Sequence, residues 1–237
     1  MVEQMIEGLI RTLREGDDAA KAAAALRLGS LACNDYSDRV LISRAGGIPP
    51  LVDLLRDGSA EAKEQAAWAL RWLACDNDAN RVLIAEAGGI PPLVELLREG
   101  SAVAKEQAAW ALGHLAHNNA ANQVLIAEAG GIAALVELLR GGSANAKFPA
   151  AQALRLLAHN NDANAVAIAA AVGLEALVEL ARRGRVTVNN RSIVENAALP
   201  AKRKAALVVA ALLRDCVPGE KRSQVRDLIR AVIGPCL

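Results

Sequence analysis

A short string of residues recurs in this chain at a fixed interval of 42 residues. Ala-Gly-Gly-Ile begins at Ala45, Ala87 and Ala129, and a degraded copy, Ala-Val-Gly-Leu, begins at Ala171. The flanking residues keep the same register from about residue 6 to residue 184. Self-similarity at a period of about 20 to 50 residues is typical of repeat proteins, whose units bury their apolar faces only against neighbouring units. The interval therefore disfavours a fold with one central core.

The residue types within one unit predict three helices. A short first helix ends at a Gly-Gly pair such as Gly88-Gly89, because glycine permits positive φ. A Pro-Pro pair follows and suits the first turn of a second helix, where a missing N–H costs no intrahelical bond. A third helix of about fifteen residues then begins after a serine that can cap it. These serines are Ser59, Ser101 and Ser143.

The composition agrees with an all-helical chain. Apolar residues make up 53% of the sequence but aromatic residues only 2%, so alanine and leucine, both strong helix formers, dominate. The short alternating runs of Val, Ile, Tyr and Phe that a β-sandwich or barrel needs are missing. A formal net charge of +1 provides no global field of the kind that dedicated nucleic-acid-binding domains carry.

The sequence also predicts the compartment. The longest uncharged apolar stretch, around residues 163–174, is shorter than the roughly 20 residues that span a bilayer. The first residues lack the basic and apolar blocks of a signal peptide, and four cysteines do not suggest a secreted disulfide framework. We expect an intracellular protein, of the cytoplasm, the nucleus or both, without membrane contact.

The third-helix pattern AAWALRWLA, together with GGIPPLVELL, resembles the armadillo repeat family over about 180 residues. The resemblance implies an all-α fold, a right-handed α-solenoid (superhelix) of stacked three-helix armadillo repeats. We expect one armadillo-repeat domain over residues 1–237, with an insertion at about 185–199 and a C-terminal capping helix at 217–237. The first unit lacks its first helix, which is expected if the chain is a fragment or is capped by another part of a longer protein. The expected repeat units are about 5–44, 45–86, 87–128, 129–170 and 171–216.

Helix geometry gathers the aromatic residues of the third helices on one face. At about 100° per residue, Trp68 and Trp72 share a face, while Ala66, Leu70 and Leu73 lie opposite and are expected in the core. The armadillo resemblance implies that third helices line a concave groove that binds a peptide or helix segment of a partner protein. The alternative is that these rings pack between units and stiffen the stack. The expected partner-binding residues are Trp68, Arg71, Trp72, Trp110, His114, Phe148, Gln152, Arg155 and Leu156.

The chain departs from the family pattern at positions that matter for binding. Family members that hold extended peptides carry a Trp and, four residues later, an Asn that bonds the peptide backbone. That second position is occupied here by Ser30, Trp72, His114 and Leu156. We therefore expect a more apolar segment, including a helix, rather than an extended basic peptide. A further local break is Pro149, which predicts a late start or a kink in the third helix of the fourth repeat unit.

Candidate metal and catalytic sites are not supported by the spacing. Cys33, Cys75, His117 and His159 recur at the same position of successive units, but stacked helices lie about 8–10 Å apart. Ligands on four consecutive rungs cannot converge on a zinc ion at about 2.0–2.3 Å. The sequence also lacks a phosphate-binding loop and a nucleophile elbow. We expect no metal, no cofactor and no enzymatic activity.

Charge is uneven along the chain, which ordinary solvation of a cap and a chain end explains, and two functional alternatives are also open. Residues 1–181 carry 15 basic and 22 acidic residues, whereas residues 182–237 carry 12 basic and 4 acidic residues. One alternative is a scaffold or self-assembly unit that stacks through its terminal repeats. The other is an acidic ligand or nucleic acid at the basic C-terminal end. Nucleic acid is the less favoured ligand, because that end has no aromatic residue for base stacking.

Overall fold

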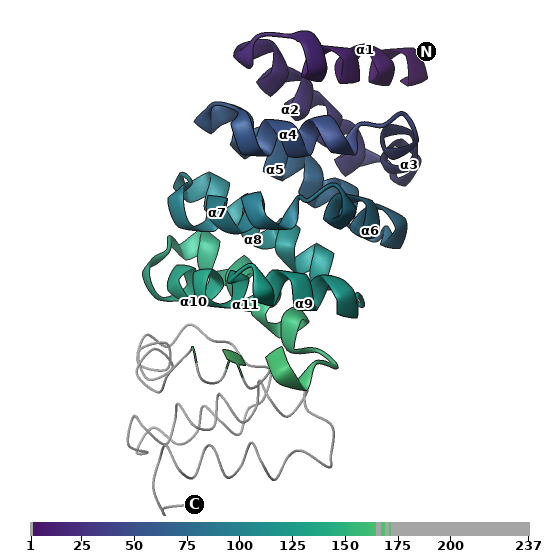
Figure 1. Cartoon of the computed structure of the whole chain (residues 1–237). Helices are drawn as coiled ribbons and strands as arrows, with labels where there is room; N and C mark the ends of the chain where they lie inside the picture. The colour runs from purple at the N-terminus through teal and green to yellow at the C-terminus, as the bar shows by residue number, and fades with distance from the viewer. Residues whose placement is uncertain (1, 165–166, 169–170, 172–237) are drawn as a thin grey trace, which may run out of the picture. The chain divides into compact units, whose positions relative to one another are not determined.

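The computed structural model describes residues 2–164, 167–168 and 171, and every secondary-structure element in that part of the chain is a helix (Figure 1). The expected all-α fold of stacked helical repeats is confirmed. The chain divides into two compact units, Met1–Leu157 and Ala158–Leu237, and the site described below lies in the first. The expected fifth repeat beyond residue 171, its insertion, the capping helix and the basic C-terminal end lie outside the described residues.

The helices follow the order expected from the repeat. First helices are α3 (Tyr36–Arg44), α6 (Asp78–Glu86) and α9 (Ala120–Glu128). Second helices are α1 (Val2–Glu15), α4 (Ile48–Asp57), α7 (Ile90–Glu99) and α10 (Gly131–Gly141). Third helices are α2 (Asp18–Asn34), α5 (Ala60–Ala74), α8 (Ala102–Ala116) and α11 (Ala144–Ala158).

Local capping explains where these helices begin. The hydroxyl oxygens of Ser59 and Ser101 accept bonds from the backbone N–H groups of Ala62 and Ala104, at 3.3 and 3.0 Å. This confirms the predicted serine caps. The chain turns through a glycine with positive φ before α4, α7 and α10, and the three φ values lie between 75° and 79°. A side chain would be strained in that conformation. The glycines are Gly46, Gly88 and Gly130.

Of the two outcomes predicted from Pro149, a late start or a kink, the late start is wrong. Helix α11 begins at Ala144, in register with the start of α8 at Ala102, and includes Pro149. The N–H groups of Ala146 and Lys147 both donate to the Ser143 carbonyl, at 3.1 Å each. The first turn is therefore complete before the proline, whose missing N–H affects a single bond further along the helix.

The core is built from small and branched apolar residues on the third helices. Ala66, Leu70 and Leu73 are buried, as predicted. Helix α5 packs against both α2 and α8, its counterparts in the neighbouring repeats. At Gly113 of α8, an added Cβ would lie 3.4 Å from Cα of Ala153 in α11. Alanine and glycine thus let successive third helices approach closely, which brings their outward side chains together.

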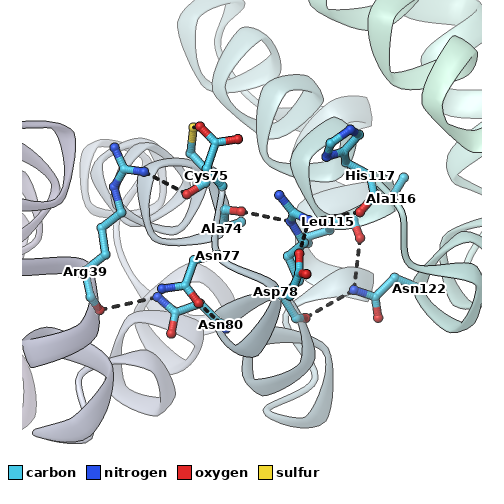
Figure 2. Close-up of polar contacts among 12 residues, drawn as sticks. Arg39, Ala74, Cys75, Asn77, Asp78, Asn80, Leu115, Ala116, His117 and Asn122 are labelled. Carbon is cyan, nitrogen blue, oxygen red and sulfur yellow. Dashed lines mark hydrogen bonds and ion pairs between the residues drawn. The ribbon is translucent and has the colours of Figure 1, made fainter. Parts of the chain in front are cut away.

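A polar ladder ties the C-terminal ends of the third helices together, and Figure 2 shows the part of it around Arg39, Asn80 and Asn122. Its members are Arg39, Asn80, Arg81, Asn122 and Gln123. Arg39 donates to the carbonyls of Ala32, at 2.7 Å, and Cys75, at 2.8 Å. Arg81 repeats this one unit later, with bonds of 3.1 Å each to the carbonyls of Ala74 and His117. The last carbonyls of a helix have no partner within that helix. Each arginine therefore satisfies such carbonyls at the ends of two successive third helices.

Asparagines supply the second half of the ladder. The Asn80 amide donates to the carbonyls of Leu73, at 2.9 Å, and Arg39, at 3.3 Å. Asn122 makes the equivalent bonds to Leu115, at 3.0 Å, and Arg81, at 3.1 Å (Figure 2). Both asparagines are buried. The first and third helices are thus held in a fixed relation by buried bonds, which sets the spacing of the outward face described next.

Candidate functional site

The predicted binding residues lie on the outward side of α5, α8 and α11, but they do not form one uniform group. The rings of Trp68, Trp72 and Trp110 are half-buried, whereas Phe148 is 59% exposed. Trp68 lies directly over Gly29 of α2, because a Cβ added to that glycine would be 2.4 Å from Cε3 of the indole. Trp68 therefore packs between two repeats, as in the alternative interpretation of these rings, and still presents part of its surface.

Arg71 lies at the centre of the face. Its guanidinium carbon is 4.7 Å from the centroid of Trp72 and 4.9 Å from the centroid of Trp110, so the cation stacks on both rings. Nη1 also donates to Oε1 of Gln107 at 2.9 Å. Burial lowers the pKa of Arg71, but a guanidinium stays charged in proteins. The chain thus fills the space between two tryptophans with its own cation.

Two further rings extend this arrangement along the face. Trp110 and His114 stack with centroids 6.0 Å apart, and Phe148 meets Trp110 edge-on with centroids 5.7 Å apart. We call Arg71, Trp72, Trp110, His114 and Phe148 the aromatic cluster. The contacts within the cluster link side chains of α5, α8 and α11, which belong to three successive repeats.

His114 is neutral at physiological pH. Its burial, followed by the positive charges of Arg71 and Arg81, lowers the pKa of His114 to about 4. A neutral imidazole offers one donor and one acceptor. It also stacks on Trp110 without adding a second positive charge next to Arg71.

The cluster contains two donors without acceptors. Nε of Arg71 and Nε1 of Trp72 are buried and have no hydrogen-bond partner among the residues that the structure describes. Buried unsatisfied donors are uncommon and carry a desolvation cost. The face therefore gives up some stability at the point where its rings are most concentrated.

The remaining predicted residues lie at the edge of the cluster. Nε of Arg155 donates to Oε1 of Gln152 at 2.9 Å, and Arg155 is exposed. Leu156 is half-buried, and its carbonyl accepts a bond of 3.1 Å from Gln123 of the polar ladder. On α11, Gln152 follows Phe148 by about one turn, and Arg155 and Leu156 follow it by about two.

Within the described part of the chain, no three His, Cys, Asp or Glu residues are close enough to hold a metal ion. Cys33 and Cys75 are free, half-buried thiols. Burial, and then the Asp76 carboxylate, raises the pKa of Cys75, which keeps this thiol protonated and unreactive.

The polar ladder was not predicted, although its signal is present in the sequence. Arg39, Arg81 and Gln123 recur at the repeat interval, as do Asn80 and Asn122. In α6 and α9 these residues lie three or four positions before the buried Ile84 and Ile126, and Arg39 lies three positions before the buried Ile42 of α3. Residues at this spacing share a helix face, so the polar residues face inward with the isoleucines. Recurrent polar residues on a buried face indicate a structural network.

Three segments of the chain, residues 37–74, 77–117 and 119–159, match the model of the Armadillo/beta-catenin-like repeat. Together they make up about half of the sequence. The chain belongs to the armadillo repeat family. No curated protein matches the armadillo chain, and none of its described helices is both long and apolar enough to cross a membrane.

Solved structures support the armadillo fold. A crystal structure of an engineered protein from the Northeast Structural Genomics Consortium is 26% identical, covers 96% of this chain and 94% of its own, and has a TM-score of 0.70. Computationally designed armadillo repeat proteins for modular peptide recognition are 23% identical, with 94% and 87% covered and a TM-score of 0.73. A designed armadillo repeat protein in complex with the peptide (KR)4 is 22% identical, with 97% and 99% covered and a TM-score of 0.69.

Proposed function

We propose that this armadillo chain is a non-catalytic module that binds a segment of a partner protein across the outward face of α5, α8 and α11. The observation that carries the proposal is the aromatic cluster, in which half-buried or exposed rings from three successive repeats meet. Aromatic and arginine side chains are the residue types that dominate binding energy at protein interfaces.

The related designed proteins support a peptide as the ligand class, because one of them is described in complex with the peptide (KR)4. The present chain differs in its chemistry. Asparagine is absent from the positions of Trp72, His114 and Leu156, and Arg71 already stacks between two indoles. We therefore favour a partner segment held by apolar side-chain contacts, including one in helical form, over an extended basic peptide.

The test begins with peptides selected from a random peptide library on the intact chain. The dissociation constant of the best peptide is then measured by isothermal titration calorimetry for the wild type, Phe148→Ser and Trp110→Ala. We expect losses of several-fold for Phe148→Ser and about tenfold or more for Trp110→Ala, because truncating a hot spot costs about 2 kcal/mol. The matched control is Tyr36→Ser, which changes an aromatic residue 54% exposed on α3.

Circular dichroism and thermal melting of each variant separate loss of binding from loss of fold. Selected peptides that bind both cluster variants as tightly as the wild type would contradict the proposal, as would a loss seen with Tyr36→Ser alone. Competition with the (KR)4 peptide adds a chemical test: we expect it to compete poorly, because Arg71 repels further cations.

A further inference from the structure

The first helices α6 and α9 bury polar residues and expose apolar ones. Their buried side is formed by Asn80, Arg81 and Ile84 in α6 and by the equivalent residues of α9. Their outward side carries two valines and two leucines, which are between 41% and 46% exposed. A surface helix of a globular protein normally shows the opposite pattern, with its apolar stripe facing inward. We call these four exposed residues the Val–Leu patch: Val82, Leu83, Val124 and Leu125.

The four residues lie on neighbouring helices, because α6 and α9 pack against each other and follow one another in the stack (Figure 1). Ala79, Ala120 and Ala121 are also exposed and add methyl groups beside the patch, whereas the exposed acids Asp78, Glu86 and Glu128 lie at the ends of the two helices. Single exposed leucines are ordinary on protein surfaces, whereas apolar side chains gathered on two neighbouring helices offer a surface that a partner helix can bury. The polar ladder on the inward side fixes these helices, and the outward valines and leucines still leave 41% to 46% of their surface exposed.

We propose that the Val–Leu patch binds an amphipathic helix of a partner protein whose apolar stripe is flanked by Lys or Arg. This surface lies on the first helices and is separate from the aromatic cluster on the third helices. It is therefore a second docking site, beyond the function proposed above.

The size of the patch favours one helix over a second copy of the chain. Each of the two helices has nine residues, which corresponds to a length of about 13 Å. With packed helices about 8–10 Å apart, their outward sides cover about 250 Å². A stable dimer buries about 800 Å² on each partner. A partner helix that crosses both α6 and α9 contacts them at two points about 10 Å apart. That distance corresponds to about seven residues of the partner helix.

The charges beside the patch define the flanks of the partner helix. Glu86 and Glu128 end α6 and α9, lie one turn beyond Leu83 and Leu125, and are exposed. Arg56 reaches the end of α6 through the Ala87 carbonyl at 3.0 Å, but it forms its ion pair with Asp53 at 3.3 Å. The two glutamates therefore complement Lys or Arg on the partner and disfavour an anionic lipid surface.

The test uses a fluorescein-labelled synthetic peptide of about 15 residues with leucines spaced for one helical face and lysines at the flanks. Two further probes have the same length: one carries Glu in place of Lys, and one has the same composition in scrambled order. Binding to the intact chain is followed by fluorescence anisotropy. The patch variant replaces each valine by serine and each leucine by glutamine: Val82→Ser, Leu83→Gln, Val124→Ser and Leu125→Gln.

The control variant, Leu26→Gln with Val103→Ser, changes the same residue types at sites 46% and 50% exposed on third helices. We expect about tenfold or greater loss of affinity in the patch variant and none in the control. The Lys-flanked peptide should bind several-fold tighter than the Glu-flanked one. Trp110→Ala should leave this binding unchanged, which separates the patch from the aromatic cluster. Thermal melts of the patch variant and the control variant test whether each is folded.

Equal binding by the patch variant, or equal binding of the scrambled peptide, would overturn the proposal. Sedimentation velocity and vesicle flotation test the other occupants. A concentration-dependent dimer that disappears in the patch variant would assign the patch to a second copy. Flotation with phosphatidylserine vesicles that depends on the patch would assign it to lipid. Either result would also overturn the proposal.

Discussion

The polar ladder and the aromatic cluster share one repeat register but use it differently. In the ladder, Arg39 and Arg81 bond to equivalent carbonyls one unit apart. On the outward face, Trp72 is followed one unit later by His114 and then by Leu156. The ladder satisfies its buried donors, whereas the cluster leaves two of its own without acceptors. This chain repeats the bonds between successive units and varies the side chains on the outward face of its third helices.

The largest expected effect comes from breaking the ladder at Arg81, which is only 3% exposed. Arg81→Ala removes the donors for the buried carbonyl of Ala74 and the half-buried carbonyl of His117, and it also removes the ion pair with Asp78. We expect the free energy of unfolding to fall by about 3 kcal/mol, measured by urea denaturation. Arg39→Ala removes the equivalent bonds at a half-buried site, so its loss should be smaller. Equal losses of unfolding free energy in the two variants would show that the contribution of a ladder arginine does not depend on its burial.

The next effect concerns the pH dependence that the aromatic cluster adds. His114 has a folded pKa of about 4, below its ordinary value of 6.5. The unfolded chain therefore binds more protons between these values, and stability falls as the pH decreases from 6.5 toward 4. We expect the loss attributable to His114 to be about 2–3 kcal/mol.

Thermal or urea unfolding of the wild type and His114→Gln at pH 7, 5.5 and 4 provides the measurement. Glutamine keeps a donor and an acceptor but does not titrate over this range. The difference in stability between the two proteins should therefore narrow or reverse as the pH falls. A constant difference would show that His114 is not protonated differently in the folded and unfolded chains.

A smaller effect is expected at Trp72. Because the indole N–H has no acceptor among the described residues, Trp72→Phe removes a buried unsatisfied donor while keeping a ring against Arg71. We expect the stability to stay within about 1 kcal/mol of the wild type. Asn122→Leu is the matched change in the ladder and should be clearly more destabilising. A large loss for Trp72→Phe would indicate that the indole N–H is hydrogen-bonded after all.

The smallest effect is expected in the turn after α5. Asp76 has a φ of 50°, and the equivalent Asn118 and Asn160 have values of 51° and 55°. Asparagine tolerates this left-handed conformation well, so Asp76→Asn should stabilise the chain by about 0.5 kcal/mol. A thermal melt detects the change, and Asn118→Asp should lower stability by a similar amount. A shift of the same sign in both variants would contradict the expectation.

Much of the fold could be predicted because its signals are local and recur. Serine caps, Gly-Gly turns and the buried face of Leu70 and Leu73 depend on residues within one turn of each other. The candidate site was harder to predict. The sequence placed Trp72 and Trp110 on one surface, but it did not predict that Arg71 would stack between them. That contact depends on how closely α5 and α8 approach each other.

The amino-acid sequence by itself determined the repeat length, the three helices of each unit and the faces that are buried, because helix periodicity and capping act over a few residues. Only the tertiary structure decided which side chains meet across repeats: Trp68 over Gly29, Arg71 between its two indoles, and arginines bridging the ends of successive third helices. Such contacts depend on interhelical distance and rotamer choice. Both are set by the packing of neighbouring units, not by the spacing of residues within one of them.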